Sequence, residues 1–524
     1  LLLFLAALFL RLYDITQHPF ILNGTEASIG IDVLNVINGT VNDPFSTGWL
    51  TNPTMPLFFL AIPVQLLGPS VLAIRLLSPF VGAVTVVVTF LVSQRLYGRA
   101  VGLVAAVLLT GSFFHLHYSR LGLTNVWDAL LVLLSLGLIA IAWPQDSSTS
   151  RHTWLLAGLA VGFSAYLYTS SHLLPLMLLL LLALTLLLDR RTWQRQWRNV
   201  VAMATVALVV ALPQILFYWA NPAIFMDRAN TLGILENQSG WLSREAAQTG
   251  ASQLQVFAQQ FWAAALAFNA TLDTGTSFGP LKPLLNFISG ILAAIGFVMV
   301  VFRIRRIQYG MLIVWVSTTI IFAGTLLLNP PNSQRYIIAA PAVNILAALS
   351  LVQLIMTLFK ESTEDAPETI TSGPWYQQKS VVMVIVLAIA ATIALYDVGY
   401  YFGSYREEHH FADRNTEIAD AMSGYLNTLE GDWSVYFYGP PSMYSDFPTI
   451  PFLAGSYQKG KNLFDITGRE EELPLTNSPN HVFIYLPERY NEITGTKVDF
   501  PGGIEKTFAG YYSTPLFHVY EVRD

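Results

Sequence analysis

A stretch without a single Lys or Arg, residues 12–74, holds the first polar residues suited to chemistry. It carries Asn23, Thr25 and Glu26, with Asp32 further along. Asn23 or Thr25 can cap a helix, and a carboxylate in the first helical turn complements the helix dipole. Such a role does not prevent Glu26 from facing a cavity, where a carboxylate acts as a base or a metal ligand. Both interpretations of Glu26 stay open.

A second polar cluster lies just before an apolar run. Asn125 and Asp128 are three residues apart, which places both on one face of a helix. A carboxylate at the start of a helix is often structural, and Arg120 can equally be an anchor whose stem is buried while its charge reaches water. His115 and His117 are two residues apart, a spacing that does not suit chelation on a helix.

A third cluster, residues 329–336, contains Arg335 beside Tyr336. A fixed guanidinium here suits bidentate contact with a phosphate, although an Arg and Tyr pair can also be an interfacial anchor. A polar turn with Tyr168 and His172 suits sugar hydroxyls, but an aromatic belt at the membrane interface explains its tyrosines equally well.

The elements that position these clusters are membrane helices. The 524 residues are 53% hydrophobic and only 12% charged, against about 25% charged residues in soluble domains. A span needs about 20 apolar residues. We therefore predict an α-helical polytopic membrane protein with eleven spans, near residues 1–13, 71–94, 100–116, 125–143, 153–169, 172–188, 199–219, 283–302, 310–328, 336–359 and 380–402. The net charge of −6 gives no reason to invoke nucleic acid.

The distribution of Lys and Arg predicts the orientation. With the N-terminus in the cytoplasm, the five cytoplasmic turns hold twelve cations, whereas the membrane-proximal external loops hold five. The acidic loop 14–70 and the loop 221–281 are then external, and residues 56–67 are too short to span and form an interfacial helix. The expected location is the plasma membrane, with the C-terminal end outside.

The composition changes after residue 402. Short β-like runs at 435–438, 481–486 and 516–522, with a helix near 411–429, predict a small extracytoplasmic α/β or α+β domain over residues 403–524. The transmembrane domain is expected to cover residues 1–402.

The order of several motifs in residues 1–402 is similar to the GT-C superfamily, in particular its branch of protein O-mannosyltransferases and lipid A aminoarabinose transferases. The resemblance rests on the acidic first loop and the interfacial helix that follows it. It also rests on Leu67-Gly68, Arg75-Leu76-Leu77-Ser78, Arg95-Leu96-Tyr97-Gly98-Arg99 and Ser119-Arg120-Leu121.

The resemblance implies an enzyme, a glycosyltransferase that moves a hexose or pentose from a polyprenyl-phosphate carrier to a protein, lipid or glycan on the outer face. A carboxylate would deprotonate or orient the acceptor while cations hold the departing phosphate. By this analogy Glu26 and Asp128 are the catalytic carboxylates, and Arg335 with Arg120 binds the donor phosphate. Further substrate contacts are expected from Asn125, Asp32, His117, Tyr168 and His172. Two carboxylates without a third ligand do not predict a metal.

Two positions depart from the family pattern. Thr25 precedes Glu26 where the family usually has Asp, and Asn125 is an amide where an acid is expected; an amide cannot be a base. These residues favour an alternative, a catalytically altered scaffold subunit of a membrane complex. A transporter or flippase is a third interpretation. It is less favoured because the spans hold few ionisable residues and no pair of Gly/Pro-broken segments recurs.

Overall fold

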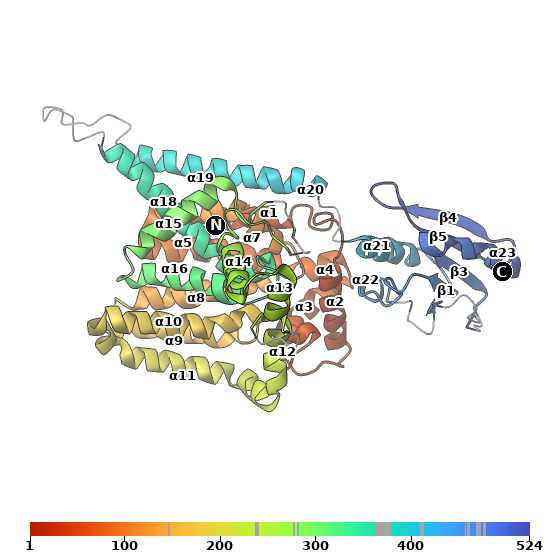
Figure 1. Cartoon of the computed structure of the whole chain (residues 1–524), viewed down its shortest axis with the longest axis horizontal. Coiled ribbons are helices and arrows are strands. Elements are labelled where there is room, and N and C mark those ends of the chain that lie inside the picture. The colour runs from red at the N-terminus through yellow and green to blue at the C-terminus, as the bar shows by residue number, and fades with distance from the viewer. Residues whose placement is uncertain are drawn as a thin grey trace. The chain divides into compact units, whose positions relative to one another are not determined.

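The computed structural model describes residues 1–144, 147–235, 240–275, 278–279, 282–361, 379–408, 413–455, 457, 462–467, 473–474 and 478–523. Over these residues the chain is mostly helical, with one mixed β-sheet near its C-terminal end (Figure 1). The chain forms two compact units. Unit 1 comprises Leu1–Tyr13, Asp43–Pro56 and Arg75–Tyr405, and unit 2 comprises Asp14–Asn42, Leu57–Ile74 and Arg406–Asp524.

Unit 1 is the helical bundle. Its main elements are α1 (Leu2–Leu12), η1 (Trp49–Thr51), α5 (Leu77–Tyr97), α6 (Arg99–Gly111), α7 (Phe113–Tyr118), α8 (Asn125–Ala142), α9 (Ser147–Ser164), η2 (Thr169–His172), α10 (Leu173–Leu188), α11 (Arg190–Ala220), α12 (Pro222–Leu232), α13 (Trp241–Thr249), α14 (Gln253–Ala265), α15 (Phe287–Val301), α16 (Ile307–Thr318), η3 (Thr319–Thr325), α17 (Ser333–Tyr336), η4 (Ile337–Ala339), α18 (Ala340–Glu361) and α19 (Lys379–Phe402). The predicted loop 221–281 thus contains α12, α13 and α14.

Each of the eleven predicted spans coincides with a helix. Among the residues described, seven helical segments are long and apolar enough to cross a membrane: Val71–Tyr97, Asn125–Ala142, Thr169–Leu188, Arg190–Ala220, Ile307–Thr325, Ser333–Phe359 and Ser380–Glu408. Shorter apolar helices lie at the predicted spans near 1–13, 100–116 and 283–302, and α9 lies at the span near 153–169. The prediction of a multi-pass helical membrane protein is confirmed.

The helices α9 and α11 pack closely because α9 presents two glycines one turn apart. A Cβ on Gly158 would lie 2.6 Å from the carbonyl oxygen of Met203, and a Cβ on Gly162 would lie 2.7 Å from that of Ala207. Small residues at this spacing let two helix backbones approach in a membrane, where dispersion contacts rather than water drive association. The pair therefore forms a rigid edge of the bundle.

Unit 2 contains the sheet, whose strand order is β2-β1-β3-β5-β4. The strands β1 (Trp433–Tyr438), β2 (Leu463–Asp465) and β3 (Asn480–Tyr485) are parallel, whereas β5 (Pro515–Val522) runs antiparallel to β3 and to β4 (Ile504–Ala509). The helices of this unit are α2 (Gly24–Ile37), α3 (Met55–Leu67), α4 (Val71–Arg75), α20 (Ser404–Glu408), α21 (Arg414–Leu426), α22 (Thr449–Leu453), η6 (Pro487–Glu492) and α23 (Ile493–Asp499). The predicted strands and helix are present, so an α/β domain follows the bundle.

Two helices of the predicted first loop, α2 and α3, belong to unit 2. The 13 residues of α3 rise only about 20 Å, which is too short to cross about 30 Å of hydrocarbon. Leu57, Leu60 and Val64 are buried, while Ile62 and Leu66 on the other face are exposed. An apolar face on each side suits a helix that packs on protein and contacts lipid, as predicted for an interfacial helix.

The helix α2 packs on α22 at a position where no side chain fits. A Cβ on Gly30 would lie 2.6 Å from the ring of Phe452, and Thr449 is buried in the same contact region. The ion pair between Arg406 and Asp14, at 2.8 Å, adds a second link inside this unit. Residues about 400 positions apart in the sequence thus form one packed structure.

Replacing Gly30 by Ala is expected to lower the stability of unit 2 by about 1–3 kcal/mol, because an added methyl group must displace the Phe452 ring from a filled site. Differential scanning fluorimetry in detergent would measure the change. The matched control is Gly424→Ala in α21, where nothing lies within 4 Å of the added carbon. Equal unfolding midpoints for the two variants would contradict the close packing of α2 on α22.

Candidate functional site

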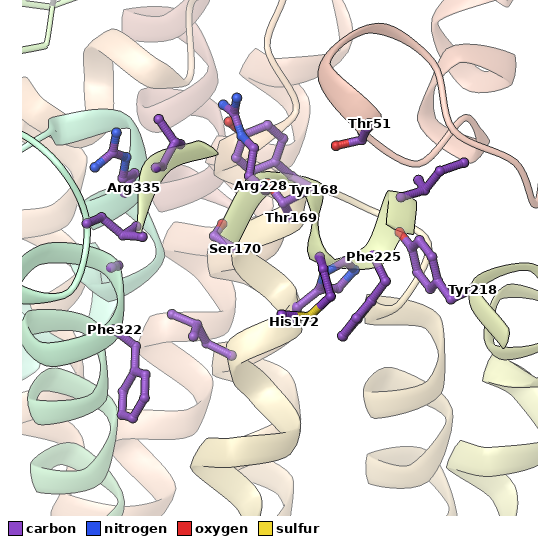
Figure 2. Close-up of a pocket in the computed structure, with 16 residues that line it drawn as sticks. Thr51, Tyr168, Thr169, Ser170, His172, Tyr218, Phe225, Arg228, Phe322 and Arg335 are labelled. Carbon is purple, nitrogen blue, oxygen red and sulfur yellow. The ribbon is translucent and has the colours of Figure 1, made fainter. Parts of the chain in front are cut away.

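A cavity of about 250 Å³ opens at one end of the helical bundle of unit 1. Figure 2 shows Arg335 on one side, Tyr218 on the other and the turn around Ser170 between them. The lining residues are Thr51, Tyr168, Thr169, Ser170, His172, Leu173, Tyr218, Ile224, Phe225, Met226, Arg228, Leu232, Phe322, Ala323, Leu327 and Arg335. They come from η1, η2, α10, the end of α11, α12, η3, the loop after it and α17. Polar groups are concentrated in η2, α12 and α17.

Two guanidinium groups give the cavity its positive charge. Arg335 lies in the short helix α17 and donates from Nη1 to the carbonyl oxygen of Leu328 at 2.9 Å. Arg228 lies in α12. Both side chains line the cavity, and in the part of the chain that the structure describes no carboxylate forms an ion pair with either of them. Two cations that form no ion pair with a described carboxylate suit an anionic ligand.

The N-terminal turn of α8 holds two walls of this cavity in place. Asn125 donates from Nδ2 to the carbonyl oxygen of Gln334 at 3.2 Å, next to Arg335. Asp128 accepts hydrogen bonds from the backbone N–H of Tyr168, at 3.1 Å, and from the Ser170 hydroxyl. Both α8 residues are buried, as their shared helical face predicts. One face of α8 therefore positions both α17 and η2.

A hydrogen bond joins α17 directly to the residue before η2. Gln334 of α17 donates from Nε2 to the hydroxyl of Tyr168, the residue just before η2, at 3.3 Å. The Nε2 atom of His172 is buried and has no hydrogen-bond partner among the residues described, although its ring packs edge-on against Tyr218 at a centroid distance of 5.6 Å. An unpaired imidazole nitrogen in the lining is available to a polar ligand.

Asp273, which the sequence analysis did not single out, organises the approach to α17. Its Oδ1 accepts from the backbone N–H of Ser333 at 2.8 Å and from that of Gly275 at 3.0 Å. The adjacent Thr274 donates from its backbone N–H to the carbonyl oxygen of Pro331 at 3.0 Å. The only sequence signal was a single acid in a loop between apolar segments. Asp273 therefore fixes the start of the helix that carries Arg335.

A pH dependence follows from the environment of Asp273. Burial raises the pKa of Asp273 above its ordinary value of 3.8. The folded chain then keeps this proton to a higher pH than the unfolded chain does. The free energy of unfolding that this group contributes therefore falls as the pH rises from 3.8 through the raised pKa.

The variant Asp273→Asn carries no charge, and its amide oxygen can still accept from the two backbone N–H groups. The unfolding midpoint of this variant relative to the unchanged protein is expected to rise as the pH rises from about 4 through the raised pKa of Asp273, because only the unchanged protein acquires a buried charge. Thermal unfolding followed at several pH values measures this difference. A difference that does not vary with pH would contradict the assignment.

Arg120 is not among the residues that line the cavity. Its side chain is buried and donates from Nη1 to the carbonyl oxygens of Leu10 and Arg11, at 2.7 and 3.1 Å. The guanidinium carbon also lies 5.0 Å from the ring centroid of Phe402. These contacts satisfy carbonyl groups near the end of α1, which a C-terminal helix end leaves without helical partners. Arg335 lines the cavity and Arg120 does not, and the predicted contact of Arg120 with the donor phosphate stays a prediction.

His117 also lies away from the cavity lining. Its Nδ1 is 3.2 Å from the Tyr401 hydroxyl, and its ring centroid is 4.7 Å from that of Phe278. This places His117 in a buried aromatic cluster, where its contacts are those of a core residue. The predicted substrate contact from His117 stays a prediction.

Glu26 and Asp32 lie in α2 and are described with unit 2. Glu26 is buried and completes a capping box: its backbone N–H donates to Asn23 Oδ1 at 2.9 Å, and its Oε2 accepts from the Asn23 backbone N–H at 3.3 Å. Asp32 is partly buried two turns further along. The capping role considered from the sequence is therefore present, and it leaves the catalytic prediction for Glu26 untested.

Comparison with solved structures decides the fold class. The chain is similar to the structure of ArnT from Cupriavidus metallidurans in the apo state, with a TM-score of 0.57, 14% identity and coverage of 99% of this chain and 97% of that chain. The structure of the same protein bound to undecaprenyl phosphate gives a TM-score of 0.54 over the same shares. The chain has the GT-C fold. The archaeal oligosaccharyltransferase AglB from Archaeoglobus fulgidus, at 13% identity and a TM-score of 0.52, covers 86% of this chain and 63% of that chain.

Sequence comparison agrees with the GT-C fold over part of the chain. A family model described as dolichyl-phosphate-mannose-protein mannosyltransferase matches residues 51–219. Undecaprenyl phosphate-alpha-4-amino-4-deoxy-L-arabinose arabinosyl transferases from Pseudomonas paraeruginosa and Pseudomonas aeruginosa are 26% identical over 167 residues, which is 31% of this chain. The match covers 29% of the length of those curated relatives. The matched family region includes η2, which lines the cavity, and α8, which contacts η2 and α17, but it ends before α17.

Among the residues described, no group of three or more His, Asp or Glu side chains could hold a metal ion. The charged groups that line the cavity are Arg228 and Arg335.

Proposed function

We propose that this protein is a membrane glycosyltransferase that moves a sugar from a polyprenyl-phosphate-linked donor to an acceptor on the extracytoplasmic face. The observation that carries the proposal is the cavity in which Arg228 and Arg335 lie without a carboxylate partner, on a GT-C fold. The solved ArnT structure with undecaprenyl phosphate supports a lipid phosphate as the ligand class. The acceptor would be a protein, a lipid or a glycan.

In this reaction the cavity would stabilise the departing phosphate. An acceptor oxygen forms a bond to the anomeric carbon while the bond from that carbon to the carrier phosphate breaks, and the phosphate leaves with the electron pair. Arg335 and Arg228 would stabilise the charge that develops on this phosphate. Tyr168, Ser170 and the unpaired Nε2 of His172 would contact sugar hydroxyls. The acceptor proton would pass to a carboxylate, for which the family resemblance offers Glu26 and Asp128 as candidates.

The membrane arrangement completes the proposal. We propose that the protein lies in the plasma membrane with its N-terminus in the cytoplasm and residues 403–524 outside. In this orientation the turns with clustered arginines face the cytoplasm, as the positive-inside rule requires. The donor then enters the cavity from the lipid. Partners in a membrane complex are compatible with this arrangement, and nucleic acid is not part of it.

The test is glycosyl transfer by the purified protein from a mixed pool of polyprenyl-phosphate sugars. The informative variant is Glu26→Gln, because Gln can replace Glu in a capping box and the helix α2 is expected to survive. Transfer by the unchanged protein that is lost in Glu26→Gln, with unchanged thermal unfolding, supports the enzyme and its carboxylate. Absence of transfer from every donor by a folded protein would overturn the enzymatic function.

A second candidate is a catalytically altered scaffold subunit of a membrane complex. It is favoured by the contacts of the two predicted catalytic carboxylates. Glu26 and Asp128 are both fully buried, and each accepts hydrogen bonds from its own surroundings. A folded protein without turnover that purifies with a membrane partner would support the scaffold.

A further inference from the structure

A second polar pocket lies far from the cavity, between the N-terminal parts of α9 and α11. Its volume is about 630 Å³, and it is lined by Arg151, Gln194, Arg195, Trp197, Arg198, Asn199 and Ala202. Tyr218, which lines the cavity, is 16 residues further along α11 than Ala202, a rise of about 24 Å. The two sites therefore occupy opposite ends of α11. We call this second site the arginine pocket.

Three guanidinium groups converge on the arginine pocket from two helices. Arg151 comes from α9, and Arg195 and Arg198 come from α11. Arg195 donates from Nη2 to the Thr192 hydroxyl at 3.2 Å, and the guanidinium carbon of Arg198 lies 5.4 Å from the ring centroid of Trp197. In the described ranges none of the three arginines forms an ion pair with a carboxylate.

Among the residues that the structure describes, Asp189 is the acid near this positive charge, and its carboxylate makes other hydrogen bonds. Asp189 caps α11 by accepting from the Thr192 backbone N–H at 3.2 Å, and it accepts from the Trp143 indole N–H at 3.3 Å. Over the described residues, three arginines and one carboxylate that already accepts two hydrogen bonds leave a net positive site. Such a site suits a phosphate, which takes several charge-assisted hydrogen bonds at once.

Two buried amide side chains, Asn199 and Gln196, form hydrogen bonds beneath the arginine pocket. Asn199 donates from Nδ2 to Gln196 Oε1 at 2.8 Å, and Gln196 donates from Nε2 to the carbonyl oxygen of Trp143 at 3.2 Å. Asn199 and Gln196 are both more than nine-tenths buried. Together with the glycine contacts between α9 and α11, these hydrogen bonds hold the arginine-bearing backbone in a fixed position before any ligand arrives.

The arginine pocket is continuous with an apolar surface along α11. The side chain of Trp197 is 48% exposed, at a position where an indole ring suits the boundary between headgroups and hydrocarbon. Beyond it, large apolar side chains remain exposed on α11: Val201, Leu208, Val209, Leu212, Ile215 and Leu216. A soluble anion would use only the pocket, whereas a phospholipid would use the pocket and this surface.

We propose that the arginine pocket binds the headgroup phosphate of an anionic phospholipid, with the acyl chains of that lipid against the exposed face of α11. Basic pockets between membrane helices are suited to acidic lipid headgroups. The inference is independent of the proposed glycosyl transfer, because it concerns the other end of α11. Its bound lipid would be a resident of the bilayer rather than a substrate.

Native mass spectrometry of the full chain, freed of lipid in detergent, tests this inference by titration with phosphatidylglycerol, with phosphatidylcholine of the same acyl chains, and with inorganic phosphate. The test variant carries Arg151→Gln, Arg195→Gln and Arg198→Gln. The matched control carries Arg303→Gln, Arg305→Gln and Arg306→Gln in the turn between α15 and α16, so both lose three positive charges. The single variant Arg198→Gln serves if the triple variant does not fold.

The unchanged protein and the control are expected to retain phosphatidylglycerol at least about tenfold more tightly than phosphatidylcholine. The test variant is expected to lose at least about tenfold in affinity for phosphatidylglycerol while its thermal unfolding in detergent stays cooperative. Equal weakening in the control would overturn the pocket, because it would indicate general attraction to charge. Equal affinity for inorganic phosphate would overturn the lipid assignment in favour of a simple anion site.

Discussion

Replacing Arg335 by Ala is expected to reduce sugar transfer by about 100- to 1000-fold, the loss typical of removing one group that stabilises a developing negative charge. Arg335 lines the cavity, and its geometry is fixed by the bond to the Leu328 carbonyl and by the contacts of α17. Arg335→Lys keeps the charge but loses the planar bidentate group, so an intermediate loss is expected. Initial rates at saturating donor measure both effects.

The control for this experiment is Arg244→Ala. Arg244 is an exposed residue of α13, in the same predicted external loop as Arg228, and it does not line the cavity. Its loss changes the net charge by the same amount, and unchanged transfer is expected. Transfer by Arg335→Ala within about threefold of the unchanged protein would contradict a role of Arg335 at the donor phosphate.

Replacing Asp128 by Ala is expected to destabilise the cavity wall strongly. The change leaves the Tyr168 backbone N–H and the Ser170 hydroxyl without their acceptor in a buried place. Each buried group left unpaired costs about 1–3 kcal/mol. A large fall in the thermal unfolding midpoint in detergent is the expected result. Ser170→Ala, which removes one of the two donors, is expected to cause a smaller fall.

The variant Asp128→Asn separates a positioning role from a catalytic one. Its amide oxygen can accept from the Tyr168 N–H, and its amide N–H can donate to the Ser170 hydroxyl oxygen. If Asp128 positions η2, this variant keeps both the fold and the transfer activity. Loss of transfer with an unchanged unfolding midpoint would instead identify Asp128 as the base predicted by family resemblance.

Hydropathy was sufficient to predict the bundle, because a bilayer imposes one length and one composition on every span. The strands near 435–438, 481–486 and 516–522 were also evident from local pattern. The spacing of Asn125 and Asp128 correctly predicted a shared helical face. Their partners, Gln334 and the η2 turn, could not be predicted, because these contacts depend on how separate helices pack.

The cavity could be found only from the structure. Arg335 and the Tyr168 turn were singled out from residue type alone, whereas Arg228 and Asp273 were not. Asp273 accepts from the backbone N–H of Ser333, which is 60 residues away in the sequence. A contact between two separate loops cannot be predicted from the periodicity of the sequence. Arg120 was assigned to the donor phosphate with Arg335 through the family resemblance, which does not reveal that its Nη1 donates to carbonyl groups of α1.

The contact between Gly30 and Phe452 also sets an order of events during synthesis. The two residues are separated by 452 − 30 = 422 positions. At about 5–20 residues per second, α2 leaves the ribosome roughly 20–80 s before the residues of α22 that cover it. During that interval Gly30 lacks the Phe452 ring that packs against it in the folded chain, so this side of α2 is completed only after nearly the whole chain has been synthesised.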